Sequence, residues 1–382
     1  MANVTDRPFS EDLLLSSHGE KLEHFQKKVF APHRNINNVL TQLLDCVVEP
    51  AGTSLFLVFG CTGSGKSTLR YQLHKRLNER FNSELLSNPG RIVVAGIEVR
   101  EEPGKFNYKD YYIRSLEALN EVLIQYKVLY KCSTEVNSRL LGNSLSQDSA
   151  AYRRALEKAL KNRGLVAFTL DEAQHLLMAA GSAQMLRQFN WMKSIANLSE
   201  TAHVLFGTYE LLNCRTWNGQ TGRRSEDIHL ARYIANQEED YTELIRVIQT
   251  FIRHMPLHEQ PDLEEHYDYI CDYCLGCVGV LKDWLHRSLR NALNDNAKTL
   301  LVKHLKKGEL STIRRNQIRE EAERGEQILQ RELSGSWQAT ANASSNREPR
   351  SEKSRQGSSR PGQRKPKRDP VGGSEQSSNP QT

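Results

Sequence analysis

The feature that most constrains this chain is the segment from Gly60 to Ser67, which has the sequence Gly-Cys-Thr-Gly-Ser-Gly-Lys-Ser. An apolar run at residues 54–59 precedes it, and a helical pattern at residues 66–80 follows it. A G-x-x-x-x-G-K-S sequence between a strand and a helix is typical of a P-loop, whose backbone N–H groups surround phosphates at a helix N-terminus. We therefore expect ATP as the ligand, held by Gly60, Cys61, Thr62, Gly63, Ser64, Gly65, Lys66, Ser67 and Thr68.

The chemistry expected at this loop depends on charged and hydroxyl side chains. Lys66 is expected to reach the β- and γ-phosphates, and the hydroxyl of Ser67 to hold Mg²⁺. Asp171 follows the apolar run at residues 165–170, which is where a second carboxylate on the magnesium side belongs. Glu172, the next residue, is placed to orient and deprotonate an attacking water. These residues predict Mg²⁺-dependent hydrolysis of ATP to ADP and phosphate.

Short apolar runs alternate with helical patterns through the first two thirds of the chain, which predicts an α/β fold with a parallel sheet covered by helices on both faces. The expected strands are residues 54–59, 92–97, 165–170, 203–206 and 227–231. The expected helices are residues 34–48, 66–80, 111–130, 150–162 and 182–197, with a polar loop or insertion at 132–149.

From residue 238 onward the pattern is helical only, so we expect a small all-helical lid after the nucleotide domain. The predicted organisation is an N-terminal extension (1–29), an α/β nucleotide-binding domain (30–236), a helical lid (237–308), a charged helix (309–333) and a disordered basic tail (334–382). The tail has nine Lys or Arg against four Asp or Glu, so it carries +5 of the formal net charge of +6. Such a tail is an electrostatic arm for nucleic acid or an acidic partner, or a solubilising segment.

Asp171-Glu-Ala-Gln174 is also a spelling of a helicase box, with a faint helicase arginine motif at residues 219–224. A two-lobed helicase needs a whole second α/β domain between these motifs, and the intervening stretch is too short for one. The other interpretation is a ring- or filament-forming ATPase. In that class Thr208, at the tip of the fourth strand, would sense the γ-phosphate. Arginines would then reach a neighbouring subunit's nucleotide, the candidates being Arg215, Arg223, Arg224 and Arg232.

Four motifs in order resemble the AAA+ ATPases that regulate DNA transposition, the TnsC and TniB type. They are Cys61-Thr-Gly-Ser-Gly-Lys-Ser-Thr68, Leu170-Asp-Glu-Ala-Gln-His-Leu176, Phe206-Gly-Thr-Tyr-Glu-Leu211, and residues 219–225 with 228–233. The resemblance covers roughly residues 30–305. It implies the AAA+ fold and assembly of this chain with itself, as a ring or filament on double-stranded DNA. It also implies a link between a target-selecting protein and the transposase, with ATP hydrolysis resetting the assembly.

The resemblance also implies roles for single residues. Lys282 falls near the sensor-two position, where many relatives have Arg, and would contact the nucleotide. Lys105 and Lys109 lie in a region that the family uses for DNA, and Lys193 is a third candidate. Such lysines would contact phosphates and leave the base sequence unread.

Cys271, Cys274 and Cys277 have a spacing that suggests either zinc or an iron–sulfur cluster, or one packed face of a helix, and packing is the preferred interpretation. No run of about 18 apolar residues exists, so we expect no membrane span. The first 20 residues also lack a signal-peptide pattern, which predicts a cytoplasmic protein with reduced thiols.

Two other classes remain open. A helicase loader or initiator-type AAA+ protein would bring a replicative helicase to DNA and usually appends a winged-helix domain. A nucleotide switch in signalling or defence would lack DNA affinity and normally carry an effector or repeat domain.

Overall fold

The computed structural model describes residues 7–100, 106–129, 144–178, 182–212 and 225–333. Residues 1–330 group into one compact unit. The predicted basic tail, residues 334–382, lies outside the described residues. Expectations that fall on residues 101–105, 130–143 and 213–224 lie outside them as well.

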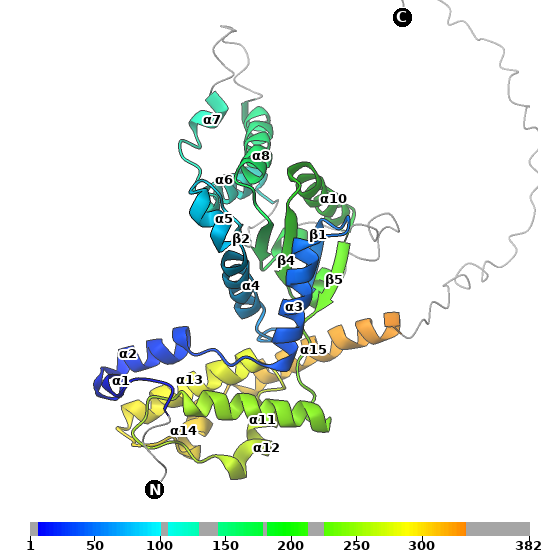
Figure 1. Ribbon diagram of the computed structural model, residues 1–382. Coiled ribbons are helices and arrows are strands. Elements are labelled where there is room, and N and C mark those ends of the chain that lie inside the picture. Colours follow the sequence, from blue (N-terminus) through cyan, green and yellow to red (C-terminus); the bar gives the residue numbers. More distant parts are fainter. Residues whose placement is uncertain (1–6, 101–105, 130–143, 179–181, 213–224, 334–382) are drawn as a thin grey trace, which may run out of the picture. The chain divides into compact units, whose positions relative to one another are not determined.

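Five parallel strands form the central sheet, in the order β2-β3-β4-β1-β5 (Figure 1). All four strand pairings are parallel, as the alternation of strands and helices predicts. The strands are β1 (Leu55–Phe59), β2 (Val94–Glu98), β3 (Ala167–Asp171), β4 (Ala202–Gly207) and β5 (Ser225–His229). Each begins within two residues of its expected start.

Side chains of β1 alternate between the two faces of the sheet because a strand repeats every two residues. Leu55 and Leu57 face a core built with α6 (Tyr108–Ala118), α8 (Ser144–Asn162) and α10 (Ser182–Ser199). Phe56 and Val58 face the opposite core, built with α3 (Arg34–Val48) and α4 (Lys66–Arg80). Both faces of β1 are therefore buried, which explains its continuous apolar sequence.

The helix expected at residues 111–130 is wrong as a single element. The structure has α6 and then the short α7 (Tyr126–Leu129), separated by left-handed residues at Asn120 (φ 51°) and Leu123 (φ 52°). Arg163, far along the chain, donates to a Glu121 carboxylate oxygen at 2.9 Å and to the Asn120 carbonyl at 3.4 Å. A distant contact therefore stabilises the turn against the local helical pattern. The polar loop expected up to residue 149 is also too long, since α8 begins at Ser144.

The helices after the sheet share a separate core, centred on the buried Trp284. They are α11 (Glu238–Arg253), a 3₁₀ turn (Glu264–His266), α12 (Tyr267–Tyr273), α13 (Val278–Asn294) and α14 (Val302–Lys307), and we call them the lid. Phe25 and Val29, from before the sheet, belong to the same core. They belong to the segment with α1 (Glu11–Leu15), α2 (His18–Glu23) and a π-helical turn (His24–Lys28). The remaining helices are α5 (Asn82–Ser87), α9 (Gln174–Met178) and α15 (Thr312–Leu333).

Candidate functional site

The P-loop connects β1 to α4 at the carboxyl edge of the sheet. Gly63 (φ 78°) and Gly65 (φ 103°) have left-handed backbones, which only glycine adopts without strain. The ammonium of Lys66 is buried at the first residue of α4 and donates to the carbonyls of Gly60 (3.0 Å) and Cys61 (2.9 Å). The loop thus forms a closed backbone cradle around its own lysine.

This cradle fits the phosphates of a nucleotide. A Cβ added at Gly65 would meet nothing within 4 Å, so open space lies beside the loop. The buried hydroxyl oxygen of Ser64 is without a hydrogen-bond partner among the described residues. Ser67 is exposed in the first turn of α4, available to ligate a cation. An unpaired polar group and exposed N–H groups at a helix N-terminus suit an anionic ligand.

Asp171 is the last residue of β3 and lies at the same edge of the sheet as the P-loop. Its carboxylate oxygen is 3.3 Å from the guanidinium of Arg70 on α4. Both side chains are largely shielded from solvent. Glu172 follows with a left-handed backbone (φ 51°), and its N–H donates to Asp171 Oδ1 at 3.1 Å. A non-glycine residue in this conformation costs about 1–2 kcal/mol, so the fold holds Glu172 in a strained position.

Thr208 directly follows β4, the neighbour of β3 in the sheet. Its backbone N–H donates to Gln174 Oε1 at 3.3 Å, and its hydroxyl donates to a Glu210 carboxylate oxygen at 3.2 Å. The structure therefore brings Thr208 and Glu172 to one edge of the sheet, linked through Gln174. Sequence reasoning did not single out Gln174.

The lid reaches the P-loop at the start of α13. Gly279 N–H donates to the Gly63 carbonyl at 2.8 Å, and a Cβ added at Gly63 would lie 2.6 Å from the Val280 side chain. Cys61 Sγ lies 3.2 Å from Cys277 Sγ, and both thiols are buried. The hydrogen bond between them lowers the pKa of the Cys61 thiol and raises that of Cys277.

The three lid cysteines are buried, and burial raises the pKa of Cys271 to about 12 and of Cys274 to about 12. Within the described residues, no group of three or more His, Cys, Asp or Glu is arranged to hold a metal ion. Nor is any helix in the described part of the chain long and apolar enough to cross a membrane.

A small cavity of about 40 Å³ lies between the P-loop, the lid and the segment that precedes α3. Lys282 lines it, and its ammonium donates to the carbonyls of Gln26 and Val29, both at 2.8 Å. Burial lowers the Lys282 pKa. In this arrangement Lys282 tethers the segment before α3 to the lid, and its predicted contact with the nucleotide stays a prediction.

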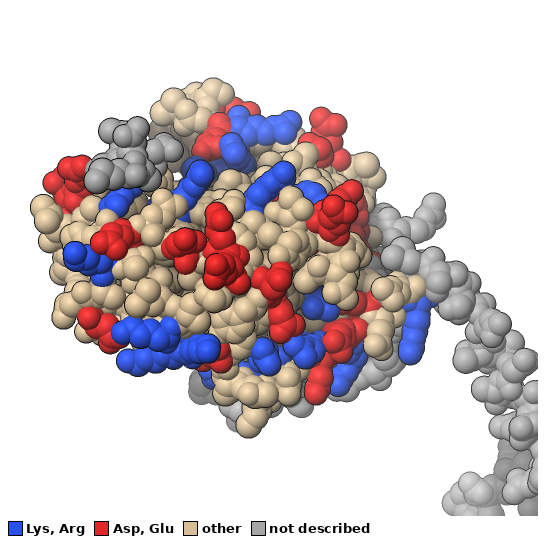
Figure 2. Space-filling view, turned by 90° about the horizontal axis from the view of Figure 1, so that it is seen from below, with Lys and Arg blue, Asp and Glu red and all other residues tan. Residues whose placement is uncertain are grey.

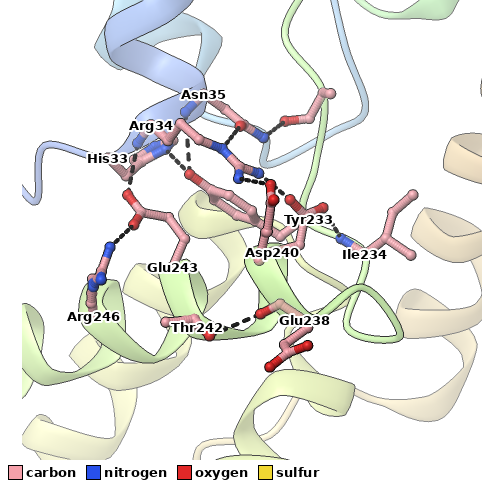
Figure 3. Close-up of polar contacts among 12 residues, drawn as sticks. His33, Arg34, Asn35, Tyr233, Ile234, Glu238, Asp240, Thr242, Glu243 and Arg246 are labelled. Carbon is pink, nitrogen blue, oxygen red and sulfur yellow. Dashed lines mark hydrogen bonds and ion pairs between the residues drawn. The ribbon is translucent and has the colours of Figure 1, made fainter.

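Figure 3 shows how the start of α3 is held against the lid. His33 Nδ1 lies 2.9 Å from the Tyr233 hydroxyl, and the backbone N–H of Arg34 donates to Glu243 at 2.9 Å. The Arg34 guanidinium pairs with Asp240. Sequence reasoning predicted the start of this helix at Arg34 correctly, but it did not single out His33 or Arg34 as contacts of the lid.

Helix α15 also contacts the P-loop. Glu321 accepts the backbone N–H of Thr62 at 3.2 Å, and Ala322 is buried. The Arg232 guanidinium binds both carboxylate oxygens of Glu326, at 2.7 and 2.9 Å, and this pairing raises the Arg232 pKa. A cavity of about 580 Å³ lies between α15, the P-loop and the end of β4.

Of the four candidate arginines, only Arg232 lies among the described residues, and it pairs with Glu326 of the same chain. Arg215, Arg223 and Arg224 lie outside the described residues.

The DNA candidates occupy different surroundings. Lys105 lies outside the described residues. The ammonium of Lys109 is 5.7 Å from the centre of the Tyr152 ring, and that of the buried Lys193 is 5.1 Å from the centre of the Phe189 ring. These positions leave the DNA contacts a prediction.

Figure 2 views the molecule from the side on which the lid helices lie. Acidic side chains run through the middle of this face, and basic ones gather toward its edges. The described residues on this face therefore form no continuous basic surface for a phosphate backbone.

The five-stranded parallel sheet, with the P-loop after its β1 strand and a helical lid, defines a P-loop AAA+ fold. Residues 51–214 match the family model described as an AAA domain, and such a domain is in general a nucleotide-hydrolysing one. Among curated proteins, none matches this sequence significantly.

Solved structures share the fold at low sequence identity. The Aeropyrum pernix ORC1 protein in complex with DNA is 16% identical, with a TM-score of 0.50 over 73% of this chain and 65% of that chain. The Aeropyrum pernix ORC2 protein, solved as ADPNP–ADP complexes, is 15% identical, with a TM-score of 0.49 over 75% and 70%. Domain III of the Thermotoga maritima replication initiation protein DnaA is 12% identical, with a TM-score of 0.40 over 74% and 94%. At these identities the likeness concerns the fold alone.

Proposed function

We propose that this chain is an ATP-dependent, DNA-binding AAA+ regulator of DNA transposition. It oligomerises on duplex DNA and links a target-selecting protein to the transposase. The observation that carries the ATPase is the meeting of the P-loop, Asp171, Glu172 and Thr208 at one edge of one sheet. The role in transposition rests on the four ordered motifs that resemble the TnsC and TniB type.

In this proposal the residues divide the work on ATP. The P-loop N–H groups and Lys66 bind the phosphates, which requires the ammonium to exchange its two carbonyl acceptors for phosphate oxygens. Ser67 and Asp171 would hold Mg²⁺, which offsets the phosphate charge. Glu172 accepts the proton of the attacking water, and Thr208 stands beside it at the end of β4.

Assembly on DNA is supported more indirectly. The same fold occurs in the ORC1 protein that was solved in complex with DNA. The arginines at 215, 223 and 224 follow β4 closely in sequence, so a neighbouring subunit's nucleotide is a suitable target for one of them.

An initiator or helicase-loader role is the second candidate, because the ORC1 protein shares the fold. A nucleotide switch without DNA affinity is the third, and it becomes an outcome of the test below.

The test is electron microscopy of the full chain with duplex DNA and a non-hydrolysable ATP analogue. We expect a DNA-bound ring or filament that is absent without nucleotide and absent in Lys66→Ala. Co-purification with a transposase then supports the first candidate, and co-purification with a replicative helicase supports the second. No DNA-bound oligomer in any nucleotide state would count against both.

A further inference from the structure

Gln174 is the first residue of α9, and its side chain is buried at 5% exposure. Its amide nitrogen donates to Glu172 Oε2 at 2.5 Å, and its amide oxygen accepts the backbone N–H of Thr208 at 3.3 Å. One side chain therefore joins the carboxylate after β3 to the backbone after β4.

The orientation of this amide is determined by its partners. Thr208 N–H can only donate and a carboxylate can only accept, so the oxygen must face Thr208 and the nitrogen must face Glu172. Gly207 leaves the room for it, because a Cβ there would lie 2.6 Å from Gln174 Oε1. Ala173 N–H also donates to the Phe206 carbonyl at 2.9 Å, which joins the two chain segments directly beside the amide.

Glu172 needs such a partner. Its backbone is left-handed and its side chain is partly exposed, so without a hydrogen bond the carboxylate has several rotamers open to it. Strained residues persist where their surroundings hold them in place, and such residues cluster at functional sites.

We infer that Gln174 is a positioning residue for ATP hydrolysis, one that fixes the Glu172 carboxylate and couples it to the backbone of Thr208. A shift at the end of β4 on nucleotide binding then reaches the Glu172 carboxylate through this amide, while the Ala173–Phe206 bond joins the two backbones. This inference rests on the proposed ATPase function, in which Glu172 accepts the proton from water.

Gln174→Glu is the sharpest perturbation. It replaces the donor to Glu172 with a second carboxyl group, and two carboxylates at this separation share one proton. Other charged groups among the described residues around this end of the sheet include Lys66 and Arg70 on α4, Glu98 on β2, Asp171 on β3 and Glu210 after β4. Glu320, Glu321 and Arg324 of α15 line the cavity beside Thr208 as well. None of them is changed by the substitution, so a change in the pH profile reports on the new pair.

The experiment measures kcat for ATP and ATP affinity, with duplex DNA present, from pH 6.5 to 9. For Gln174→Glu we expect kcat to fall about 10- to 100-fold at pH 7, with ATP affinity within about twofold of wild type, and to recover partly as pH rises. Gln174→Asn keeps the amide but shortens its reach, so kcat should fall without a shift of the pH profile. Gln249→Glu, the same exchange on an exposed position of α11, should match wild type.

A Gln174→Glu variant that binds ATP and hydrolyses it at the wild-type rate across this pH range would overturn the inference. So would a loss of kcat that is the same at every pH in both Gln174 variants, because that pattern indicates a structural role. If Gln174→Glu does not fold, a wild-type kcat in Gln174→Asn would overturn the inference instead. Failure of the proposed function is distinct: wild type would then show no ATP hydrolysis, or Glu172→Gln would hydrolyse ATP normally.

Discussion

Replacing Glu326 with alanine should loosen α15 from the nucleotide site. The Glu326 carboxylate makes two charge-assisted hydrogen bonds with the Arg232 guanidinium, and the two side chains are only 22% and 16% exposed. After the substitution, Arg232 retains its hydrogen bond to the Leu275 carbonyl, at 3.2 Å.

The expected cost follows from this burial. Exposed ion pairs contribute about 0.2–1 kcal/mol, whereas hydrogen bonds to charged groups contribute about 1.5–3 kcal/mol. Because both partners are mostly shielded and the contact is bidentate, we expect α15 to lose about 2 kcal/mol of docking free energy. That corresponds to about a 30-fold larger population of the undocked helix.

Hydrogen–deuterium exchange of peptides from α15 measures this population directly, since exchange follows local opening. Glu326→Ala should accelerate exchange in α15 by about 30-fold and leave the lid peptides around Trp284 unchanged. Glu323→Ala removes the same charge from an exposed position of the same helix and serves as the control.

Equal exchange rates in the Glu326 and Glu323 variants would refute the reasoning. They would mean that the packing of Ala322 and of Gly325 against Tyr209 holds the helix without the ion pair. Arg232→Met in the Glu326→Ala background should add little further loss, because the two side chains act as one unit.

The remaining predictions concern binding and stability. Lys66→Ala should abolish measurable ATP binding by calorimetry without unfolding the chain, since it removes the cation of the phosphate site. Gly276→Ala should destabilise the fold by more than about 2 kcal/mol in urea unfolding, because the backbone is left-handed (φ 71°) and the new Cβ would lie 1.7 Å from the Tyr233 carbonyl oxygen; Gly90→Ala is the control. Burial lowers the pKa of His33 to about 4 and of His203 to about 4. Between pH 6.5 and 4 these two histidines are therefore protonated in the unfolded chain but largely neutral in the folded chain. The free energy of unfolding should therefore decrease as the pH is lowered from 6.5 to 4, by up to about 1.4 kcal/mol per pH unit for each histidine. His33→Gln should make this dependence on pH less steep.

The sequence is sufficient to predict the parts of the fold that local patterns dictate. The helices at Arg34–Val48 and Lys66–Arg80 have their predicted bounds, because an apolar stripe defines the first and the P-loop starts the second. The buried strands follow from their continuous apolar runs. The P-loop, Asp171 and Thr208 come to one edge because the carboxyl ends of parallel strands meet there.

Contacts between distant residues were beyond the reach of these patterns. The pairing of Arg232 with Glu326 joins residues 94 positions apart, and neither residue's neighbours indicate it. Arg163 likewise stabilises a turn that local periodicity would continue as a helix. The bond between Gln174 and Thr208 depends on the register of β3 and β4, which hydrophobic patterning does not specify for parallel strands.

The contact between Gly63 and the lid changes how variation in the phosphate loop should be interpreted. Gly63 cannot gain a side chain without displacing Val280, and a Cβ added at Gly279 would lie 2.5 Å from the Gly63 carbonyl oxygen. In related sequences, residues at positions 63, 279 and 280 should therefore vary together. A Gly63 mutant could therefore lose ATP affinity either through the phosphate loop or through displacement of the lid at Val280. If a smaller residue at position 280 restores the affinity, the defect lies in the contact with the lid.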